Sequence, residues 1–134
     1  MYVHSIIGQV VEIGKNYIVI EHMPFRYKIN CTQQAISGAT IHLPISLLLY
    51  QNITDDDESW YGFSTKEEYD LFVELIKVTG IGPAKAIKVL GYPTDVVIQA
   101  LSLEDRRLFL SIPGFGPRLT DKMFLEIGKK YKIK

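Results

Sequence analysis

Two short stretches of this chain carry glycine, proline and basic residues in nearly the same order. They read TGIGPAKAIKVL at 79–90 and PGFGPRLTDKMF at 113–124, and their Gly-X-Gly-Pro turns begin 34 residues apart. Glycine can adopt the positive φ that closes a tight turn, and proline is favoured at the first position of a helix. Each turn should therefore open a helix whose first N–H groups lack partners and can bind an anion such as phosphate.

The basic side chains that follow each turn could hold a phosphate from the side. We therefore predict two turns that grip successive phosphates, or both strands, of a DNA duplex without reading its bases. The predicted contact residues are Gly80, Gly82, Ala84, Lys85 and Lys88 in the first copy, and Gly114, Gly116, Arg118 and Lys122 in the second. Ile81 and Phe115, inside the turns, are expected in the core. The alternative is a pair of structural connectors with ordinary surface lysines.

Two better-known patterns share features with these turns. A spacing of 34 residues equals the tetratricopeptide repeat length, but only two copies are present and the aromatic pattern of that repeat is absent. A dinucleotide-binding fingerprint needs a third glycine and a preceding strand. Both copies lack that glycine, and a helical pattern precedes each of them. Neither pattern explains the doubled turn.

The first half of the chain has the period-two pattern of strands. Five segments are β-branched or alternate apolar with polar residues, and GKN at 14–16 marks a hairpin turn. They read SIIGQVVEI, YIVIEH, FRYKINC, ATIHLPISLLLYQN and SWYGF. Pro44, within the fourth, requires an edge or a bulge. We predict a five-stranded antiparallel β-barrel of the OB-fold type, with a small sandwich or an SH3-like barrel as the alternative.

The second half changes to helical periodicity. Five helices are predicted within 65–79, 82–91, 94–101, 102–112 and 116–133. Thr65 and Glu68 are spaced as a capping box, and Thr94 is predicted to cap the third of these helices. The chain should therefore be an α+β protein of two domains, a barrel at 1–63 and an all-α domain with the two turns at 64–134.

Composition limits the remaining choices. The 134 residues hold 15 basic and 15 acidic side chains, but residues 1–63 carry a net charge of −3 and residues 64–134 a net charge of +3. Such asymmetry suggests two modules with different partners or faces. One cysteine, Cys31, indicates a reducing compartment. No signal peptide or membrane span is seen, so we expect a cytoplasmic protein with no membrane partner. No cofactor and no metal are expected either.

The doubled turn is the helix–hairpin–helix motif, which occurs in many DNA-binding proteins. With a small barrel before it and YGFSTKEEYDLFVELIKVTGIGPAKAIKVL at 61–90, the chain resembles the RuvA family, the Holliday-junction-binding subunits of the bacterial branch-migration machinery. The resemblance covers nearly the whole chain, including IIGQVVEI at 6–13 and LSIPGFGPRLTDK at 110–122. It implies a non-catalytic homotetramer, or two such tetramers face to face, that holds a four-way DNA junction open for the ATPase RuvB.

The resemblance also assigns roles to particular residues. Asp55 and Asp56, in TDDDESW at 54–60, fall at the positions of an acidic pin at the tetramer centre, with the register open because Asp57 and Glu58 follow. The alternative for this run is a solvated loop. Ala84 stands at a usual basic position, and in the second turn Pro117 replaces a usual lysine and Thr120 a small alanine. These departures imply a weaker, more salt-sensitive grip.

Two further differences from the family concern other parts of the chain. EHMPFRYKI at 21–29 replaces a usual glycine-rich turn, so that hairpin should differ in shape. The chain ends just after the last predicted helix, so we expect the family's third domain, which engages RuvB, to be missing, whether removed or naturally absent. Such a chain should bind junctions without coupling properly to the motor.

Two other function classes stay open. A helix–hairpin–helix nuclease or glycosylase would need a catalytic Asp or Lys beside a base pocket, or a metal-binding carboxylate cluster. Asp55, Asp56 and Asp57 form the only acidic cluster, and the three histidines fall in strand-like segments. A barrel that binds single strands would expose aromatic residues for stacking, and Tyr17, Phe25 and Tyr27 are candidates.

Overall fold

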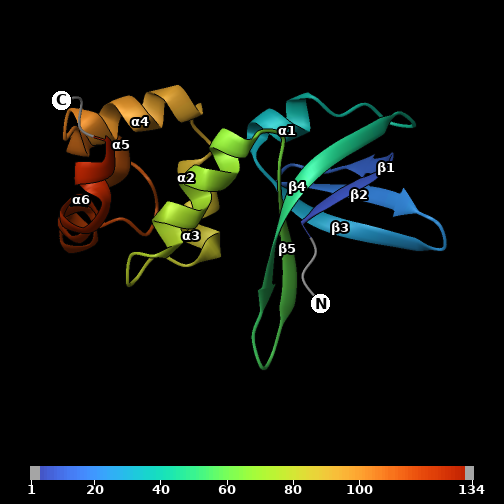
Figure 1. Ribbon diagram of the computed structural model, residues 1–134, viewed down its shortest axis with the longest axis horizontal. Helices are drawn as coiled ribbons and strands as arrows, with labels where there is room; N and C mark the ends of the chain where they lie inside the picture. Colours follow the sequence, from blue (N-terminus) through green and yellow to red (C-terminus); the bar gives the residue numbers. More distant parts are fainter. Residues whose placement is uncertain (1–3, 132–134) are drawn as a thin grey trace. The chain divides into compact units, whose positions relative to one another are not determined.

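The computed structural model describes residues 4–131, and their contacts divide the chain into two units, Met1–Tyr69 and Asp70–Lys134. The first unit is a closed five-stranded barrel with strand order β1-β2-β3-β5-β4 (Figure 1). Its elements are β1 (Ser5–Ile13), β2 (Tyr17–His22), β3 (Phe25–Cys31), α1 (Gln33–Ser37), β4 (Pro44–Ile53) and β5 (Glu58–Phe63). The barrel closes through one parallel pair, β3 with β5, and the other pairs are antiparallel.

The barrel core follows from the alternation of residues along the strands. Val10, Ile18, Ile20 and Ile29 are all fully buried, and residues between them face outward. Side chains on one side of a strand share a face, so these β-branched residues line the interior of the barrel. The predicted five-stranded barrel is confirmed, as are the hairpin at 14–16 and the bounds of β2 and β3. The prediction that all strands are antiparallel was wrong, because β3 and β5 pair in parallel.

The segment between β3 and β4 differs from the prediction. Helix α1 was not among the predicted elements. Its N-cap, Thr32, accepts a hydrogen bond from the Ala35 amide at 3.1 Å. The predicted strand at 39–52 was too long, because β4 begins only at Pro44, where a proline needs no ladder N–H. His42 lies in the preceding turn with φ 71°, so its predicted place in a strand was wrong.

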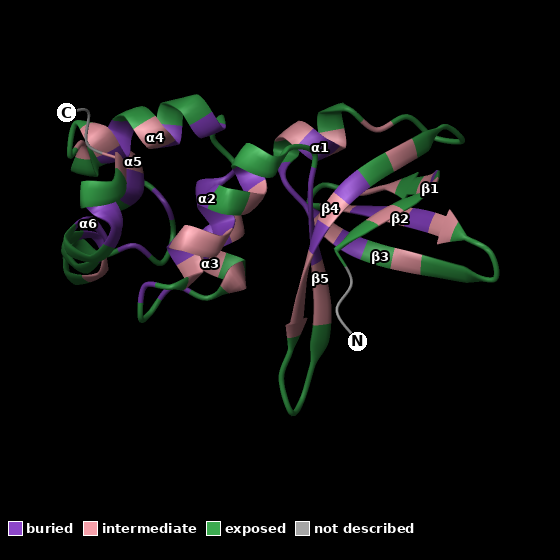
Figure 2. Cartoon of the chain, viewed as in Figure 1, coloured by how far each residue is buried: buried purple, intermediate pink, exposed green. Residues whose placement is uncertain are grey.

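The second unit continues α2 (Lys66–Ile76) and adds four more helices. These are α3 (Pro83–Val89), α4 (Thr94–Ser102), α5 (Arg106–Leu110) and α6 (Pro117–Tyr131). The α4, α5 and α6 helices contact one another. Buried residues recur along each of them, while their outer faces are exposed (Figure 2). All five predicted helices are present, although the end of the last prediction, at 132–133, lies outside the described residues.

Helix starts were only partly predicted. Thr65 accepts a hydrogen bond from the Glu68 amide at 3.2 Å, as expected. The Glu68 carboxylate accepts its hydrogen bonds from Ser64, one residue before the expected Thr65. The Ser64 amide donates at 3.0 Å and the Ser64 hydroxyl at 2.7 Å. The predicted cap at Thr94 was wrong, because Pro93 occupies the N-cap of α4 and no side chain caps it. Within residues 4–131, no helix is long and apolar enough to cross a membrane.

Candidate nucleic-acid interface

The two Gly-X-Gly-Pro turns have the same backbone geometry. Gly80 has φ 101° and Gly114 has φ 94°, so the predicted positive φ is confirmed in both. The residue after each glycine donates its amide back across the turn, Ile81 to Val78 at 3.0 Å and Phe115 to Ile112 at 3.1 Å. Because an L side chain rarely adopts this φ, the turns depend on glycine at these positions.

Each turn opens directly into a helix. Helices α3 and α6 begin at Pro83 and Pro117, which confirms the predicted place of both prolines. The first intrahelical bonds match as well, because Gly82 and Gly116 each accept an amide hydrogen bond at 3.0 Å. Ile81 and Phe115 are 3% and 4% exposed, so their predicted core positions are also confirmed.

The second glycine of each turn faces open space. A Cβ built on Gly82 or on Gly116 would have no atom of the chain within 4 Å. Within residues 4–131, no group accepts a hydrogen bond from the amides of Gly82, Ala84, Gly116 or Arg118. Both turns therefore present unsatisfied backbone N–H groups, at the positive end of a helix, on a surface that another molecule can approach.

The first glycine of each turn is exposed, but a side chain of the other hairpin lies close to the place where its Cβ would be. A Cβ on Gly80 would lie 3.0 Å from Cδ1 of Leu119, and a Cβ on Gly114 would lie 3.1 Å from Cε of Lys85. Leu119 and Lys85 occupy equivalent positions, each five residues after its own turn glycine. The two motifs thus pack reciprocally. We call these two contacts the cross-hairpin contacts.

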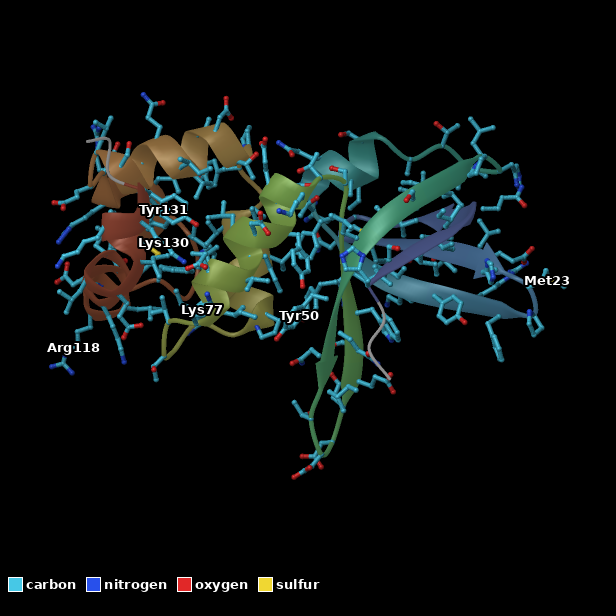
Figure 3. The ribbon with its side chains drawn as sticks, viewed as in Figure 1. Met23, Tyr50, Lys77, Arg118, Lys130 and Tyr131 are labelled. Atoms are coloured by element: carbon cyan, nitrogen blue, oxygen red, sulfur yellow. The ribbon has the colours of Figure 1, made fainter. Side chains whose placement is uncertain are left out.

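Three cations near the turns have no carboxylate partner among the described residues. Lys88, Arg118 and Lys122 are exposed, and no described carboxylate lies within 4 Å of them. Figure 3 shows Arg118 extending away from α6 into solvent. By contrast, Arg106 pairs with Asp121 at 3.1 Å. The turns therefore carry positive charge that no carboxylate within residues 4–131 neutralises.

Glu74 neutralises two cations elsewhere in this unit. Its carboxylate accepts hydrogen bonds from Nζ of Lys130 at 2.7 Å and from Nζ of Lys77 at 2.8 Å, joining α6 to α2 (Figure 3). The bond from Lys130, and then the bond from Lys77, lower the pKa of Glu74. Burial, with smaller contributions from nearby carboxylates, raises the pKa of the neighbouring Tyr131 to about 12. This cluster connects the two ends of the helical unit.

The acidic run lies at the tip of the β4–β5 hairpin, which extends beyond the rest of the barrel (Figure 1). Thr54 and Asp57 close the turn, with the Thr54 amide on the Asp57 carbonyl at 2.8 Å and the Asp57 amide on the Thr54 hydroxyl at 3.1 Å. Asp55 and Asp56 therefore occupy the apex, and both are exposed. Glu58 lies on the strand, where its carboxylate accepts a hydrogen bond from Gln51 at 3.0 Å.

The aromatic residues proposed for stacking on single strands lie in different environments. Phe25 is 60% exposed, and its ring lies 6.1 Å from that of Tyr27. Tyr17 donates its hydroxyl proton to Glu12 at 2.6 Å, and Nζ of Lys28 lies 4.5 Å from its ring centroid. Tyr27 also lines, with Trp60, an apolar hollow of about 260 Å³ on the barrel. Of the three candidates, Phe25 has the most exposed ring.

The structure gives no support for a metal site in the part of the chain that it describes. No group of three or more His, Cys, Asp or Glu side chains within residues 4–131 is placed to hold an ion. Cys31 is buried, and burial raises the pKa of its thiol to about 12. A thiol in this environment stays protonated and unreactive near neutral pH.

Three side-chain placements were not visible in the sequence. Lys85 was predicted to face a phosphate, but its Nζ donates to the Gly80 carbonyl at 3.3 Å and its stem lies over Gly114. Leu119 was not singled out, although it covers Gly80. The bond between Gln51 and Glu58 across the acidic hairpin was also missed. The 34-residue offset between Lys85 and Leu119 was the one available signal for the first two.

Comparisons with known proteins match both units. Residues 1–62 match the family model of the RuvA N terminal domain, and residues 72–129 match that of the SAM-like Helix-hairpin-helix tandem. Similar curated proteins are named Holliday junction branch migration complex subunit RuvA. The one from Hathewaya histolytica is 34% identical over 94% of this chain and 65% of its own length, and the one from Bacillus cytotoxicus is 33% identical over 92% and 60%.

The relative from Borrelia turicatae is 29% identical over 98% of this chain and 68% of its own length. The chain spans just under two thirds of the length of the Hathewaya relative. The two family models match the barrel and the helical unit separately, in the order in which they occur along this chain. With its closed five-stranded barrel and two matched helix–hairpin–helix turns, the chain is therefore similar to RuvA proteins in both of its units.

Proposed function

We propose that this chain binds four-way DNA junctions and holds them open for branch migration in recombination and repair. The observation that carries the proposal is the pair of matched turns. In the part of the chain that the structure describes, each turn has amides without an acceptor beside cations without a carboxylate partner. The names of the relatives support the same function, since they describe subunits of a Holliday junction branch migration complex.

The proposed grip is on the phosphate backbone. Amides at Gly80, Gly82 and Ala84 would face one phosphate, and the equivalent amides at Gly114, Gly116 and Arg118 would face another. Lys88 and Lys122 would add charge from the side of each helix. Contacts of this kind fix the position of a duplex without reading its sequence. They also release counterions, so the binding constant should fall steeply as salt rises.

The acidic hairpin would act where the strands separate. Asp55 and Asp56 are the proposed pin, because they occupy the apex of the β4–β5 turn, and the Thr54–Asp57 contacts support this register. Carboxylates repel phosphates, and the repulsion increases where the surroundings lower the effective dielectric constant. Acidic side chains near a junction centre would therefore keep the exchanging strands apart.

The proposed assembly is a homotetramer, or two tetramers face to face, built mainly through the barrels and working with the ATPase RuvB. In this proposal the chain is a non-catalytic DNA-binding subunit, and ATP hydrolysis belongs to RuvB. Such a protein works where the chromosome lies, in the bacterial cytoplasm. In the RuvA family the contact with RuvB is made through a third domain. For the described residues, the proposed partner is therefore the DNA junction.

A gel mobility shift tests the proposal. A synthetic four-way junction is compared with a linear duplex of the same arm sequence, at low and moderate salt with Mg²⁺, and with a single strand. We expect preference for the junction, weakened by salt and abolished in the Gly82→Asp, Gly116→Asp double variant. A Gln99→Asp, Leu125→Asp variant adds the same charge at exposed helix positions away from the turns and should bind normally.

Three other outcomes would count against the proposal. Equal binding to junction and duplex would leave only a general backbone binder. Preference for the single strand would favour the barrel and Phe25 as the binding surface. Absence of binding at low salt would make both turns structural connectors.

A further inference from the structure

The two hairpins are not equivalent in charge, although they are equivalent in backbone. A shift of 34 residues relates Ala84 to Arg118 and Lys85 to Leu119. The first hairpin thus has its cation at the position that packs against the other hairpin, and the second has its cation at the exposed position. This exchange changes what the two basic residues can do.

The Lys85 side chain is occupied within the protein. Its Cε lies 3.1 Å from the place where a Cβ of Gly114 would be, and its Cγ and Cδ lie at 3.7 Å. Its Nζ donates to the Gly80 carbonyl at 3.3 Å, so stem and head together contact both turns. A lysine stem readily packs on nonpolar surface while its ammonium keeps polar contacts. Leu119 fills the equivalent place over Gly80 with no charge at all.

We propose that Lys85 is a positioning residue that fixes the spacing of the two hairpins and does not itself bind phosphate. This inference rests on the proposed function of the turns. One side-chain cation, Lys88, then serves the first turn, whereas Arg118 and Lys122 serve the second. The second hairpin should supply the larger share of the salt-dependent grip, and the first should act mainly through backbone amides.

The salt dependence of binding separates positioning from direct contact. Each phosphate neutralised adds about 0.9 to the slope of log K against log salt on duplex DNA. Lys85→Met keeps a long unbranched stem and removes the charge, so we expect the wild-type slope. Lys88→Met, on the same helix, is the matched control and should reduce the slope by about 0.9. Equal losses in the two variants would overturn the inference.

A truncation tests the packing half of the inference. Lys85→Ala removes the stem over Gly114, and we expect it to weaken junction binding by about three- to tenfold at every salt concentration, since a few methylene contacts are lost. Lys85→Met should restore that affinity. An alanine variant that binds like the wild type, or a methionine variant that fails to restore binding, would refute the positioning role.

The denaturation midpoint of each variant separates the positioning role of Lys85 from the proposed junction-binding function. Without DNA, Lys85→Met should unfold near the wild-type midpoint and Lys85→Ala below it, because only the second loses the cross-hairpin contact. A wild-type chain that does not bind junctions would refute the proposed function. The order of the denaturation midpoints of Lys85→Met and Lys85→Ala would still test the cross-hairpin contact. A wild-type chain that binds, with Lys85→Met and Lys85→Ala unfolding alike, would refute the inference alone.

Discussion

Alanine in place of each turn glycine should separate folding from binding. Gly80 and Gly114 have positive φ, and a side chain of the other hairpin lies 3.0–3.1 Å from where their Cβ would be. Gly82 and Gly116 do not have positive φ and face open space. We therefore predict that Gly80→Ala and Gly114→Ala destabilise the helical unit. We predict that Gly82→Ala and Gly116→Ala leave its stability nearly unchanged and weaken DNA binding.

The magnitudes follow from the backbone. A side chain forced into a left-handed conformation costs about 1–2 kcal/mol, and the Cβ would also press on Lys85 or Leu119 at 3.0–3.1 Å. In a unit of this size, that cost should lower the melting temperature by roughly 5–15 °C. Gly82 has φ −94° and ψ 179°, which alanine adopts freely. In the Gly82→Ala variant, alanine is a poorer N-cap than glycine, which destabilises the fold, but it lowers the entropy of the unfolded chain, which stabilises the fold. The two effects nearly cancel, so the free energy of unfolding should change by about 0.5 kcal/mol or less.

Thermal unfolding followed by circular dichroism measures the first effect, and junction affinity at a temperature where every variant is folded measures the second. A melting temperature lowered as much by Gly82→Ala as by Gly114→Ala would refute this prediction. It would also be refuted if Gly114→Ala melted like the wild type. Intact junction binding by the Gly82→Ala, Gly116→Ala double variant would place the DNA elsewhere.

Further predictions concern single side chains. Ala84→Lys adds an exposed cation at the place equivalent to Arg118, so the salt slope of junction binding should steepen by about 0.9, and an unchanged slope would remove this position from the interface. Lysines lower the pKa of Glu74, so its contribution to stability is present above the ordinary carboxyl range and is lost as pH falls through the lowered value. Glu74→Gln should therefore cost about 0.5–1 kcal/mol in urea at pH 7 and progressively less as pH falls through that lowered value, and a cost that does not change with pH would contradict this. Cys31 has a pKa raised from 9.0 to about 12, so its contribution to stability is present below pH 9 and is lost as pH rises toward 12. Iodoacetamide should label this thiol at pH 8 only in denaturant, and fast labelling of the native protein would show that it is accessible. Thr65→Ala should cost about 1 kcal/mol through loss of the N-cap, measured by urea unfolding against Thr40→Ala as an exposed control.

Local signals explain what the sequence could predict. The alternation in FRYKINC and the GKN turn define strands and a hairpin without reference to the rest of the chain. The glycine–proline order of the two turns likewise specifies backbone geometry within five residues. For these features, local propensity and tertiary structure agree.

The remaining features depend on contacts or on weak competing signals. Helix α1 has a Thr32 cap and ends before Gly38, but the β-branched residues that follow obscured it. Thr94 has the chemistry of a cap, yet Pro93 already holds the extended backbone that the N-cap needs. The position of Lys85 over Gly114 arises from packing between residues far apart in sequence, which no local pattern encodes.

Equilibrium competition on the wild-type chain tests the central claim most directly. A fluorescent four-way junction is bound at moderate salt, and unlabelled linear duplex of the same arm sequence is added in increasing excess. We predict that the junction stays bound until the duplex is present in large excess, while unlabelled junction displaces it at equal concentration. Displacement by duplex and by junction at the same concentration would contradict junction recognition and leave only general binding to the DNA backbone.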